Sequence, residues 1–253
     1  MLLEAVQYAA THAVTPKAFR PFIRSSVSLW SRAGRCAKAW APHEENCKAF
    51  IRETTDGMKQ KRTAVVLGSG LLRDVPIKEL SKQFDTVVLV DLVHLASVRM
   101  WLKAGRLRNV RLISRDLSGF EDAVAGKPVE PLAFLRQVPY LDLVVSANIL
   151  SQIGVGAKRR LEREKRQGKD EIVRALILAH LDGLTTLPCR TVLLTDTSYR
   201  VTDRKEIVRE EADLLCGVPA PIAKRKWIWP VAPYGELSRD CQAIHEVIAR
   251  SSS

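Results

Sequence analysis

The sequence has no pair of cysteines at the spacing of a metal or redox motif. Its five cysteines, an odd number, are scattered from Cys36 to Cys241 and no two form a Cys-x-x-Cys pair. This argues against a zinc site and against a disulfide framework, so no metal is expected. No apolar run approaches the ~18 residues that cross a bilayer, and the opening MLLEAVQYAA lacks the basic residues of a signal peptide. We therefore expect a cytoplasmic protein without a membrane span.

Acidic residues are in deficit, with 28 Asp and Glu against 40 Lys and Arg, a net charge of +12. Such a charge attracts nucleic acid, anionic lipid or acidic small molecules, and it does not choose among them. The most basic stretch, residues 158–169, has no aromatic side chain, which argues against a platform for single-stranded nucleic acid. Its interspersed glutamates favour a solvated helix with internal ion pairs over a basic lip for an anionic substrate.

Strand-like apolar runs are absent before residue 63, and residues 1–60 show helical spacing instead. Beyond that point short apolar runs alternate with helical patterns. We predict strands at 63–68, 85–91, 110–114, 141–146, 191–195, 226–231 and 242–249, and helices at 75–83, 92–104, 170–186 and 203–215. Apolar strands without polar alternation imply a parallel sheet covered on both faces, hence a doubly wound α/β fold. The last two strands flank a Gly-Glu turn and predict an antiparallel hairpin at one edge.

Three motifs follow successive predicted strands. The first strand runs into Gly68-Ser69-Gly70, where glycines allow a tight turn and close approach to a ligand. Asp91 ends the second strand, where a carboxylate can accept both hydroxyls of a ribose. Asp116 follows the third, at a place where it can meet an adenine edge. In this order the motifs predict a nucleoside-containing ligand. A dinucleotide is disfavoured because Arg73 stands where the pyrophosphate motif needs glycine.

With these motifs, residues 62–249 resemble the class I S-adenosylmethionine (SAM)-dependent methyltransferases. The glycine turn matches the first motif of that family, Asp91 the ribose-binding acid, Asp116 the adenine-side acid, and LDLVVSANILSQI at 141–153 the fourth-strand motif. The resemblance implies a mostly parallel seven-stranded sheet with a terminal antiparallel hairpin, a SAM-binding domain at 61–253, and an N-terminal helical extension at 1–60 that covers the acceptor pocket as a lid. It also implies SAM as cofactor, held by Gly68, Ser69, Gly70, Asp91, Leu92, Asp116, Leu117 and Asn148.

Two positions depart from the family pattern and leave the function open. Val66 stands where an acid is usual, and Leu72 where a third glycine is usual, so Asp74 or the N-terminal helices are expected to supply missing contacts to the methionine end of SAM. The leading hypothesis is methyl transfer to a small-molecule acceptor, favoured by the net charge to be anionic. The glycine turn followed by leucine also resembles nicotianamine-synthase-like enzymes, which transfer the aminocarboxypropyl arm. A non-catalytic methyltransferase-like module that binds an acidic protein or nucleic acid is the third alternative, with nucleic acid not favoured.

Three residues are catalytic candidates, and no base is assigned. His43 lies in the polar segment WAPHEEN, Asn148 follows the fourth strand, and Tyr199 follows the fifth. In the resembled family Ser151 and Gln152 would line the path between cofactor and acceptor. His180 and His245 are expected to be structural, and Trp227 and Trp229, two apart in a strand, are expected to share one face and pack in the core.

Overall fold

A computed structural model of the chain describes residues 2–252. Its helical elements are α1 Leu2–Val14, η1 Lys17–Phe22, α2 Ile23–Arg35, α3 Ala37–Asp56, α4 Ile77–Gln83, α5 Ala96–Ala104, α6 Phe120–Val124, η2 Ala133–Gln137, α7 Leu150–Arg163 and α8 Lys169–Thr185. The strands are β1 Thr63–Leu67, β2 Thr86–Asp91, β3 Val110–Ser114, β4 Leu141–Ala147, β5 Arg190–Asp203, β6 Val208–Asp213, β7 Arg225–Ala232 and β8 Cys241–Ser251.

The strands form one sheet in the order β3-β2-β1-β4-β5-β8-β7. Strands β1 to β5 pair in parallel, whereas β8 is antiparallel to both β5 and β7. This confirms the predicted doubly wound α/β fold with an antiparallel pair at one edge. The order reverses between β1 and β4, which is where sheets of this kind leave a crevice for ligands at the carboxyl ends of the strands.

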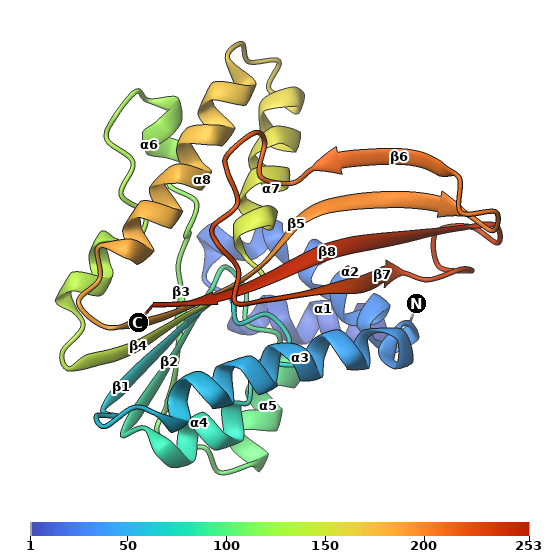
Figure 1. Cartoon of the computed structure of the whole chain (residues 1–253). Helices are drawn as coiled ribbons and strands as arrows, with labels where there is room; N and C mark the ends of the chain where they lie inside the picture. The colour runs from blue at the N-terminus through green and yellow to red at the C-terminus, as the bar shows by residue number, and fades with distance from the viewer. Residues whose placement is uncertain (1, 253) are drawn as a thin grey trace.

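Helices cover both faces of the sheet, with α6, α7 and α8 above it and α3, α4 and α5 below it in Figure 1. All five residues of β1 are buried, because this central strand has a helical layer on each side. Val66 points into the core that includes α3, α4 and α5, and Val65 into the core that includes α7 and α8. Val66, which stands where the resembled family usually has an acid, is therefore an apolar side chain in a packed core.

Residues 203–215 are not helical, and the prediction of a helix there is wrong. Val208–Asp213 forms β6, an additional strand that pairs with the edge of β5 and makes the sheet eight-stranded. The Asp203 carboxylate accepts hydrogen bonds from the backbone nitrogens of Lys205 (2.9 Å) and Ile207 (3.0 Å), which turns the chain back on itself. A free edge on the long strand β5 thus outweighs the helical propensity of this acidic segment.

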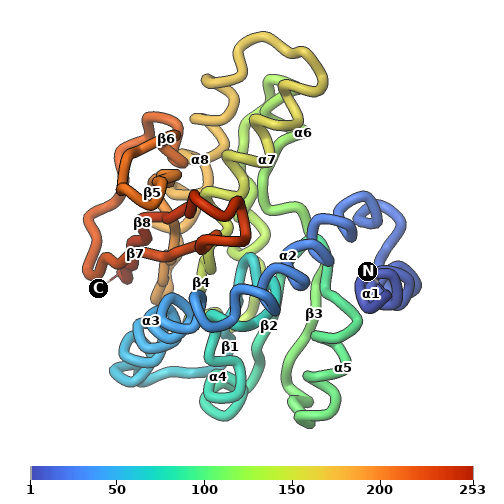
Figure 2. Tube along the Cα trace, turned by 90° about the vertical axis from the view of Figure 1, so that its right-hand side faces the viewer, coloured from blue at the N-terminus to red at the C-terminus, as the bar shows by residue number. Residues whose placement is uncertain are grey.

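The long strands β5 and β8 continue beyond the parallel part of the sheet. Together with β6 and β7 they form a ribbon that extends to the right in Figure 1, past the carboxyl ends of β1 to β4. Viewed toward those ends in Figure 2, α2 crosses in front of the parallel strands, between α1 and α3. Helix α3 packs on β7 and β8. The N-terminal helices and the ribbon therefore border the carboxyl edge of the sheet from two sides.

Helix α5 begins later than predicted, at Ala96 instead of residue 92. Residues between β2 and α5 form a loop, and the first turn of α5 takes its cap from elsewhere in the chain. The backbone nitrogen of Ala96 donates to the hydroxyl of Thr11, a fully buried residue of α1, at 3.0 Å. This contact fixes the N-terminal helices beside the loop that follows Asp91. Within residues 2–252, no helix has both the length and the apolar character needed to cross a membrane.

Candidate functional site

The glycine turn passes directly against the end of β4. Gly68 and Gly70 have positive φ angles of 72° and 46°, which side chains other than glycine rarely adopt. A Cβ atom on Gly68 would lie 2.7 Å from the Cβ of Ile149 and 2.9 Å from the carbonyl oxygen of Ala147. Leu72, at the position of the usual third glycine, also has a left-handed backbone (φ 58°). The turn therefore keeps its shape despite the substitution.

The Asp91 carboxylate is hydrogen-bonded to this turn. One oxygen accepts from the backbone nitrogen of Gly70 at 2.7 Å, and the other accepts from that of Leu92 at 2.7 Å. Each carboxylate oxygen has two lone pairs, so each can accept a further hydroxyl donor. Burial raises the pKa of Asp91, although these two donors oppose the rise. Asp91 thus lies where the resemblance implies a ribose-binding acid.

His94 is the neutral neighbour of this carboxylate. Its ring is buried, and Nε2 lies 3.0 Å from the carbonyl oxygen of Ile113, an acceptor that requires the proton on Nε2. Burial lowers the pKa of His94. We therefore assign His94 a neutral ring that supports the loop after β2.

Asp116 and Leu117 lie at the end of β3, on the same edge of the sheet. Asp116 is exposed and accepts hydrogen bonds from the backbone nitrogen (2.8 Å) and the hydroxyl (2.7 Å) of Ser118, whereas Leu117 is buried. The carboxylate therefore shapes the turn that leads into α6. A role toward adenine stays a prediction.

Two buried side-chain oxygens at the carboxyl edge have no hydrogen-bond partner, the hydroxyl of Ser69 and Oδ1 of Asn148. Asn148 follows β4 with a left-handed backbone (φ 51°), and its Nδ2 donates to the Asp74 carboxylate at 2.6 Å. Burial raises the pKa of Asp74, although the hydrogen bond from Asn148 opposes this. Because buried polar atoms are nearly always paired in folded proteins, these two oxygens, which have no partner within residues 2–252, are candidates for contact with a polar ligand.

Arg73 joins the loop after the glycine turn to α3. Its Nε donates to one carboxylate oxygen of the buried Glu44 at 2.6 Å, and its Nη2 donates to the other at 3.3 Å. A cleft of about 710 Å³ lies next to this ion pair, between α1 and α2 on one side and the loop with α5 on the other. The cleft is lined by Leu3, Glu4, Trp30, Ser31, Ala33, Gly34, Arg35, Leu71, Leu72, Arg73, Ser97, Val98 and Trp101.

His43 lies at the crossing of α3 and β7, among aromatic side chains. Its Nδ1 is 3.0 Å from Nε1 of Trp227, and its ring stacks on Trp229 with 4.0 Å between centroids and 9° between planes. An indole nitrogen only donates, so Nδ1 accepts and the neutral ring carries its proton on Nε2. Nε2 lies 3.5 Å from Nδ2 of Asn148. Burial lowers the pKa of His43 to about 4.

This arrangement bears on the proposed role of His43. Nδ1 accepts from Trp227, Nε2 lies 3.7 Å from the Cys47 sulfur, and the burial that lowers the pKa of His43 keeps the ring neutral. A proton-accepting step would require the Nδ1 lone pair that already accepts from Trp227. The geometry favours a positioning role between Asn148 and the two tryptophans. The expected shared face of Trp227 and Trp229 is present, and it packs on His43 as well as on the core.

The remaining polar residues come from the start of α7 and the middle of β5 and form a second group with His245. Tyr199, predicted to follow the fifth strand, lies within it, because β5 continues to Asp203. The Asp196 carboxylate accepts from the hydroxyl of Ser151 with one oxygen, and its other oxygen lies 2.5 Å from Nδ1 of His245. Tyr199 contacts the His245 ring at 5.9 Å between centroids, but its hydroxyl donates to Glu210 on β6. Gln152 donates to the carbonyl oxygen of Asn148 at 2.7 Å. His245, which the sequence predicted to be structural, thus belongs to one network with Asp196.

The basic stretch 158–169 spans the end of α7 and the turn into α8. Arg160 pairs with Glu121 and Glu164, both at 2.8 Å, and Arg166 pairs with Glu164 at 2.9 Å. These pairs agree with the solvated helix laced with ion pairs. His180 is buried against β4, where its Nε2 lies 2.9 Å from the Ser146 hydroxyl, as expected for a structural residue. Among residues 2–252, no group of three or more His, Cys, Asp or Glu side chains is placed to hold a metal ion.

No protein-family model matches the chain, and no curated protein matches its sequence. Solved structures that match include a SAM-dependent methyltransferase from Aquifex aeolicus (11% identity, 80% of this chain and 89% of that one, TM-score 0.36). A second is the N-methyltransferase NodS from Bradyrhizobium japonicum in complex with S-adenosyl-L-homocysteine (SAH), with 13% identity over 81% of this chain and 86% of that one and a TM-score of 0.38. A third is the 23S rRNA methyltransferase ErmE, with 12% identity over 81% of this chain and 68% of that one and a TM-score of 0.32. At such identity a likeness concerns the fold alone.

The topology of the chain itself gives the fold. Five parallel strands in the order β3-β2-β1-β4-β5 are followed by β8, antiparallel, between β5 and β7. This is a mostly parallel sheet with a terminal antiparallel hairpin, as the resemblance implied, with β6 added at the edge of β5. The chain therefore has the doubly wound α/β fold that its resemblance to the class I SAM-dependent methyltransferases implies.

Proposed function

We propose that the chain binds SAM at the carboxyl edge of β1, β2 and β4 and transfers its methyl group to a small-molecule acceptor. The observation that carries this proposal is the 2.7 Å hydrogen bond from Gly70 to Asp91, which joins the glycine turn to the acid at the end of the neighbouring strand. The resemblance assigns the acid to the ribose of SAM and the glycine turn to the first motif of the family. The pair lies at the carboxyl end of β1, which borders the point where strand order reverses, and ligands of doubly wound folds bind there.

The residues around this pair fit SAM. Asp91 would accept the ribose hydroxyls, and Leu92, Asp116 and Leu117 would border the adenine, as the resemblance implies. The unpartnered Ser69 hydroxyl can donate to the carboxylate of the methionine end, and the unpartnered Oδ1 of Asn148 can accept from its ammonium. SAM supplies a methyl group on a sulfonium, so the protein has mainly to hold donor and acceptor in line.

The acceptor would lie beside Asn148, toward His43, Trp227 and Trp229. These side chains come from α3 and β7, which border the carboxyl edge, so the helices at 1–60 serve as part of the pocket wall and lid. A small acceptor is preferred to nucleic acid because the most basic stretch has no aromatic side chain on which bases could stack, and two of its arginines are paired with Glu121 and Glu164. The net charge of +12 favours an anionic acceptor.

The nucleoside product tests this proposal and separates it from its alternatives. Purified protein is incubated with SAM and a low-molecular-weight cell extract as the source of acceptors, and the products are identified by mass spectrometry. We expect SAH together with a methylated compound, and loss of both in Asp91→Asn. Asp85→Asn, at the other end of β2, is the matched control and should leave them unchanged. Methylthioadenosine in place of SAH would indicate aminocarboxypropyl transfer, and no product from SAM would favour a non-catalytic binding module.

A further inference from the structure

Asp196 is a buried carboxylate with both oxygens hydrogen-bonded by side chains. Ser151, at the start of α7, donates to Oδ1, and Nδ1 of His245 on β8 lies 2.5 Å from Oδ2. Burial raises the pKa of Asp196, but the hydrogen bonds from His245 and Ser151 outweigh it and hold the pKa below its usual value. Asp196 is therefore ionised, and an ionised carboxylate accepts without donating.

The ionised Asp196 carboxylate fixes the tautomer of His245. The proton must lie on Nδ1, between the ring and Asp196, and in the neutral ring the lone pair of Nε2 is then free. No hydrogen bond joins Nε2 to any residue of the described chain, and the His245 side chain keeps 17% of its surface exposed. His245 is thus oriented by a carboxylate on one side and able to accept a proton on the other, which is the arrangement of a general base.

The strands on both sides of His245 depart from regular pairing. The register of β5 with β8 shifts between Asp196 and Ser198, and that of β7 with β8 shifts between Trp229 and Ala232. Such irregularities are frequent beside active sites, where they re-aim a side chain. Two shifts around one histidine therefore point to a site more than to a structural contact.

Aromatic contacts connect His245 to the proposed SAM site. Trp229 meets the His245 ring edge-on, with 5.6 Å between centroids, and stacks on His43, whose Nε2 is 3.5 Å from Asn148. The indole nitrogen of Trp229 is buried and has no partner. An indole donor without an acceptor, on a ring that contacts His245, matches an acceptor molecule that carries an oxygen with a proton to lose.

We propose that His245 is the general base of the transfer and that the acceptor carries a hydroxyl group as its nucleophile. This inference rests on the proposed function. The acceptor oxygen forms a bond to the methyl carbon as the carbon–sulfur bond breaks, and the electron pair of that bond stays on sulfur, giving SAH. The hydroxyl proton passes to Nε2 of His245. The resulting imidazolium is balanced by Asp196 and releases the proton to solvent through its exposed surface.

Asp196 and Ser151 are positioning residues in this scheme. Asp196→Asn would place an amide donor opposite Nδ1 or move the ring proton to Nε2, which removes the free lone pair. In the serine proteases a comparable exchange of the orienting aspartate lowers kcat by about 10⁴ through the wrong tautomer. We expect a loss of the same kind here, with the KM for the acceptor unchanged.

The test compares a hydroxyl acceptor with a thiol of the same shape, because a thiol ionised at neutral pH needs no base. The probes are 4-hydroxybenzoate and 4-mercaptobenzoate, used with SAM labelled in the methyl group. His245→Gln and Asp196→Asn are compared with Glu246→Gln, the adjacent residue of β8, which points to the opposite face. We expect both site variants to lower methylation of the hydroxyl by about 100-fold or more and of the thiol by less than about 3-fold. Glu246→Gln should change neither rate.

A second measurement, which needs no catalytic turnover, reports the protonation of the His245 ring. Nitrogen-15 NMR of the wild-type protein with SAH should show His245 protonated at Nδ1 and unprotonated at Nε2, and Asp196→Asn should invert this. The proposal is overturned if the two rates fall together, if neither falls, if wild-type protein with bound SAH does not methylate the hydroxyl, or if Nε2 carries the proton. Failure of wild-type protein to bind SAH would instead count against the proposed function. If His245→Gln does not fold, the wild-type NMR spectrum and Asp196→Asn still decide the matter.

Discussion

The Asp91 carboxylate accepts a hydrogen bond from the backbone nitrogen of Gly70 at 2.7 Å. Asp91 ends β2 and Gly70 lies in the turn that follows β1, and these parallel strands end in register, with Leu67 beside Val90. The acid and the glycine turn, which are 21 residues apart in the chain, are thereby fixed relative to each other before any ligand arrives. A site that is already formed spends less binding free energy on ordering itself.

Alanine substitutions at the two glycines of the turn should differ in cost. Gly68→Ala places a Cβ 2.7 Å from Ile149 and 2.9 Å from a carbonyl oxygen at φ 72°, so we expect a loss of about 2–4 kcal/mol in the free energy of unfolding. The nearest atom to a Cβ on Gly70 is 3.8 Å away, and only the backbone strain remains, about 1 kcal/mol. Urea denaturation measures both. Equal losses would show that the close approach of β4 is not as described.

Stability should fall as pH falls from neutral, because of two buried histidines. Burial lowers the pKa of His43 and of His180 to about 4, from an ordinary 6.5. Between these values the unfolded chain binds more protons than the folded chain, so unfolding becomes easier as pH drops through this window. Each histidine contributes up to about 3 kcal/mol at the lower end. The free energy of unfolding of His180→Gln should depend less steeply on pH between 6.5 and 4 than that of wild type, and identical slopes would contradict the assignment.

Removal of the indole donor should change the titration of His43. Trp227→Phe deletes the hydrogen bond to Nδ1 that stabilises the neutral ring, while burial of the ring by α3 and Trp229 remains. We expect the pKa of His43 to rise from about 4, as followed by NMR of the ring protons. A value that stays the same or falls would mean that Trp227 does not set the protonation of His43.

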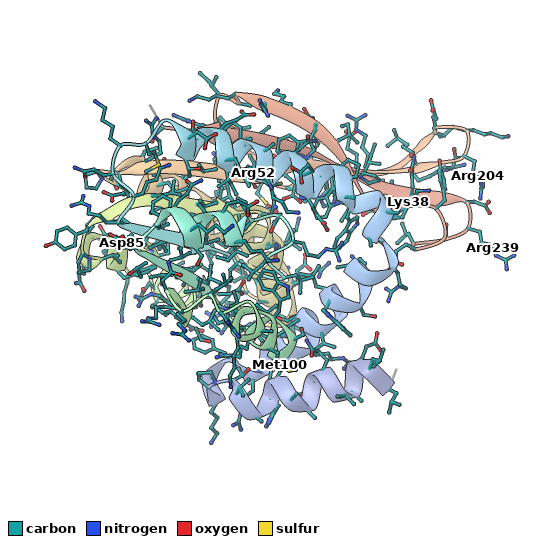
Figure 3. All side chains as sticks on the ribbon, turned by 90° about the horizontal axis from the view of Figure 1, so that it is seen from below. Lys38, Arg52, Asp85, Met100, Arg204 and Arg239 are labelled. Atoms are coloured by element: carbon teal, nitrogen blue, oxygen red, sulfur yellow. The ribbon has the colours of Figure 1, made fainter. Side chains whose placement is uncertain are left out.

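The turn between β5 and β6 should depend on Asp203. Asp203→Ala removes the acceptor for the backbone nitrogens of Lys205 and Ile207 and the partner of Arg209. Amide hydrogens of β6 should then exchange at least about 5-fold faster, because local opening becomes easier. Asp240→Ala, which removes only an exposed partner of Arg204, is the control and should leave exchange in β6 unchanged. In Figure 3, Arg204 and Arg239 mark the tip of this ribbon, far from Asp85.

The parallel half of the fold is predictable from sequence because its signals are local. Each central strand is a short apolar run between helical patterns, and the glycine turn and Asp91 follow directly from such runs. The ribbon is less predictable. Residues 203–215 have the composition of a helix, and only the long edge of β5, which no local pattern reveals, makes Val208–Asp213 a strand.

The contacts of Asp196 with His245 and of His43 with Trp227 could not be predicted from the sequence for a similar reason. Asp196 and His245 are 49 residues apart and meet only because β8 pairs antiparallel with β5, across a register shift. Likewise His43 and Trp227 are 184 residues apart and meet where α3 crosses β7. The alternation that placed Trp227 and Trp229 on one face was a usable signal, but its partner on α3 depends on tertiary packing. Asp74 was foreseen as a substitute acid near the methionine end, and it lies beside Asn148.

The most direct test of the account is a calorimetric titration of the folded protein with SAH. We predict a dissociation constant in the micromolar range for wild type and for Asp85→Asn, and binding weakened by at least about 30-fold in Asp91→Asn, because a buried charge-assisted acceptor is lost. The Asp91→Asn variant should keep its fold, as checked by circular dichroism. Absence of binding to folded wild-type protein free of ligand, or equal binding by Asp91→Asn, would contradict the assignment of this edge of the sheet as a SAM site.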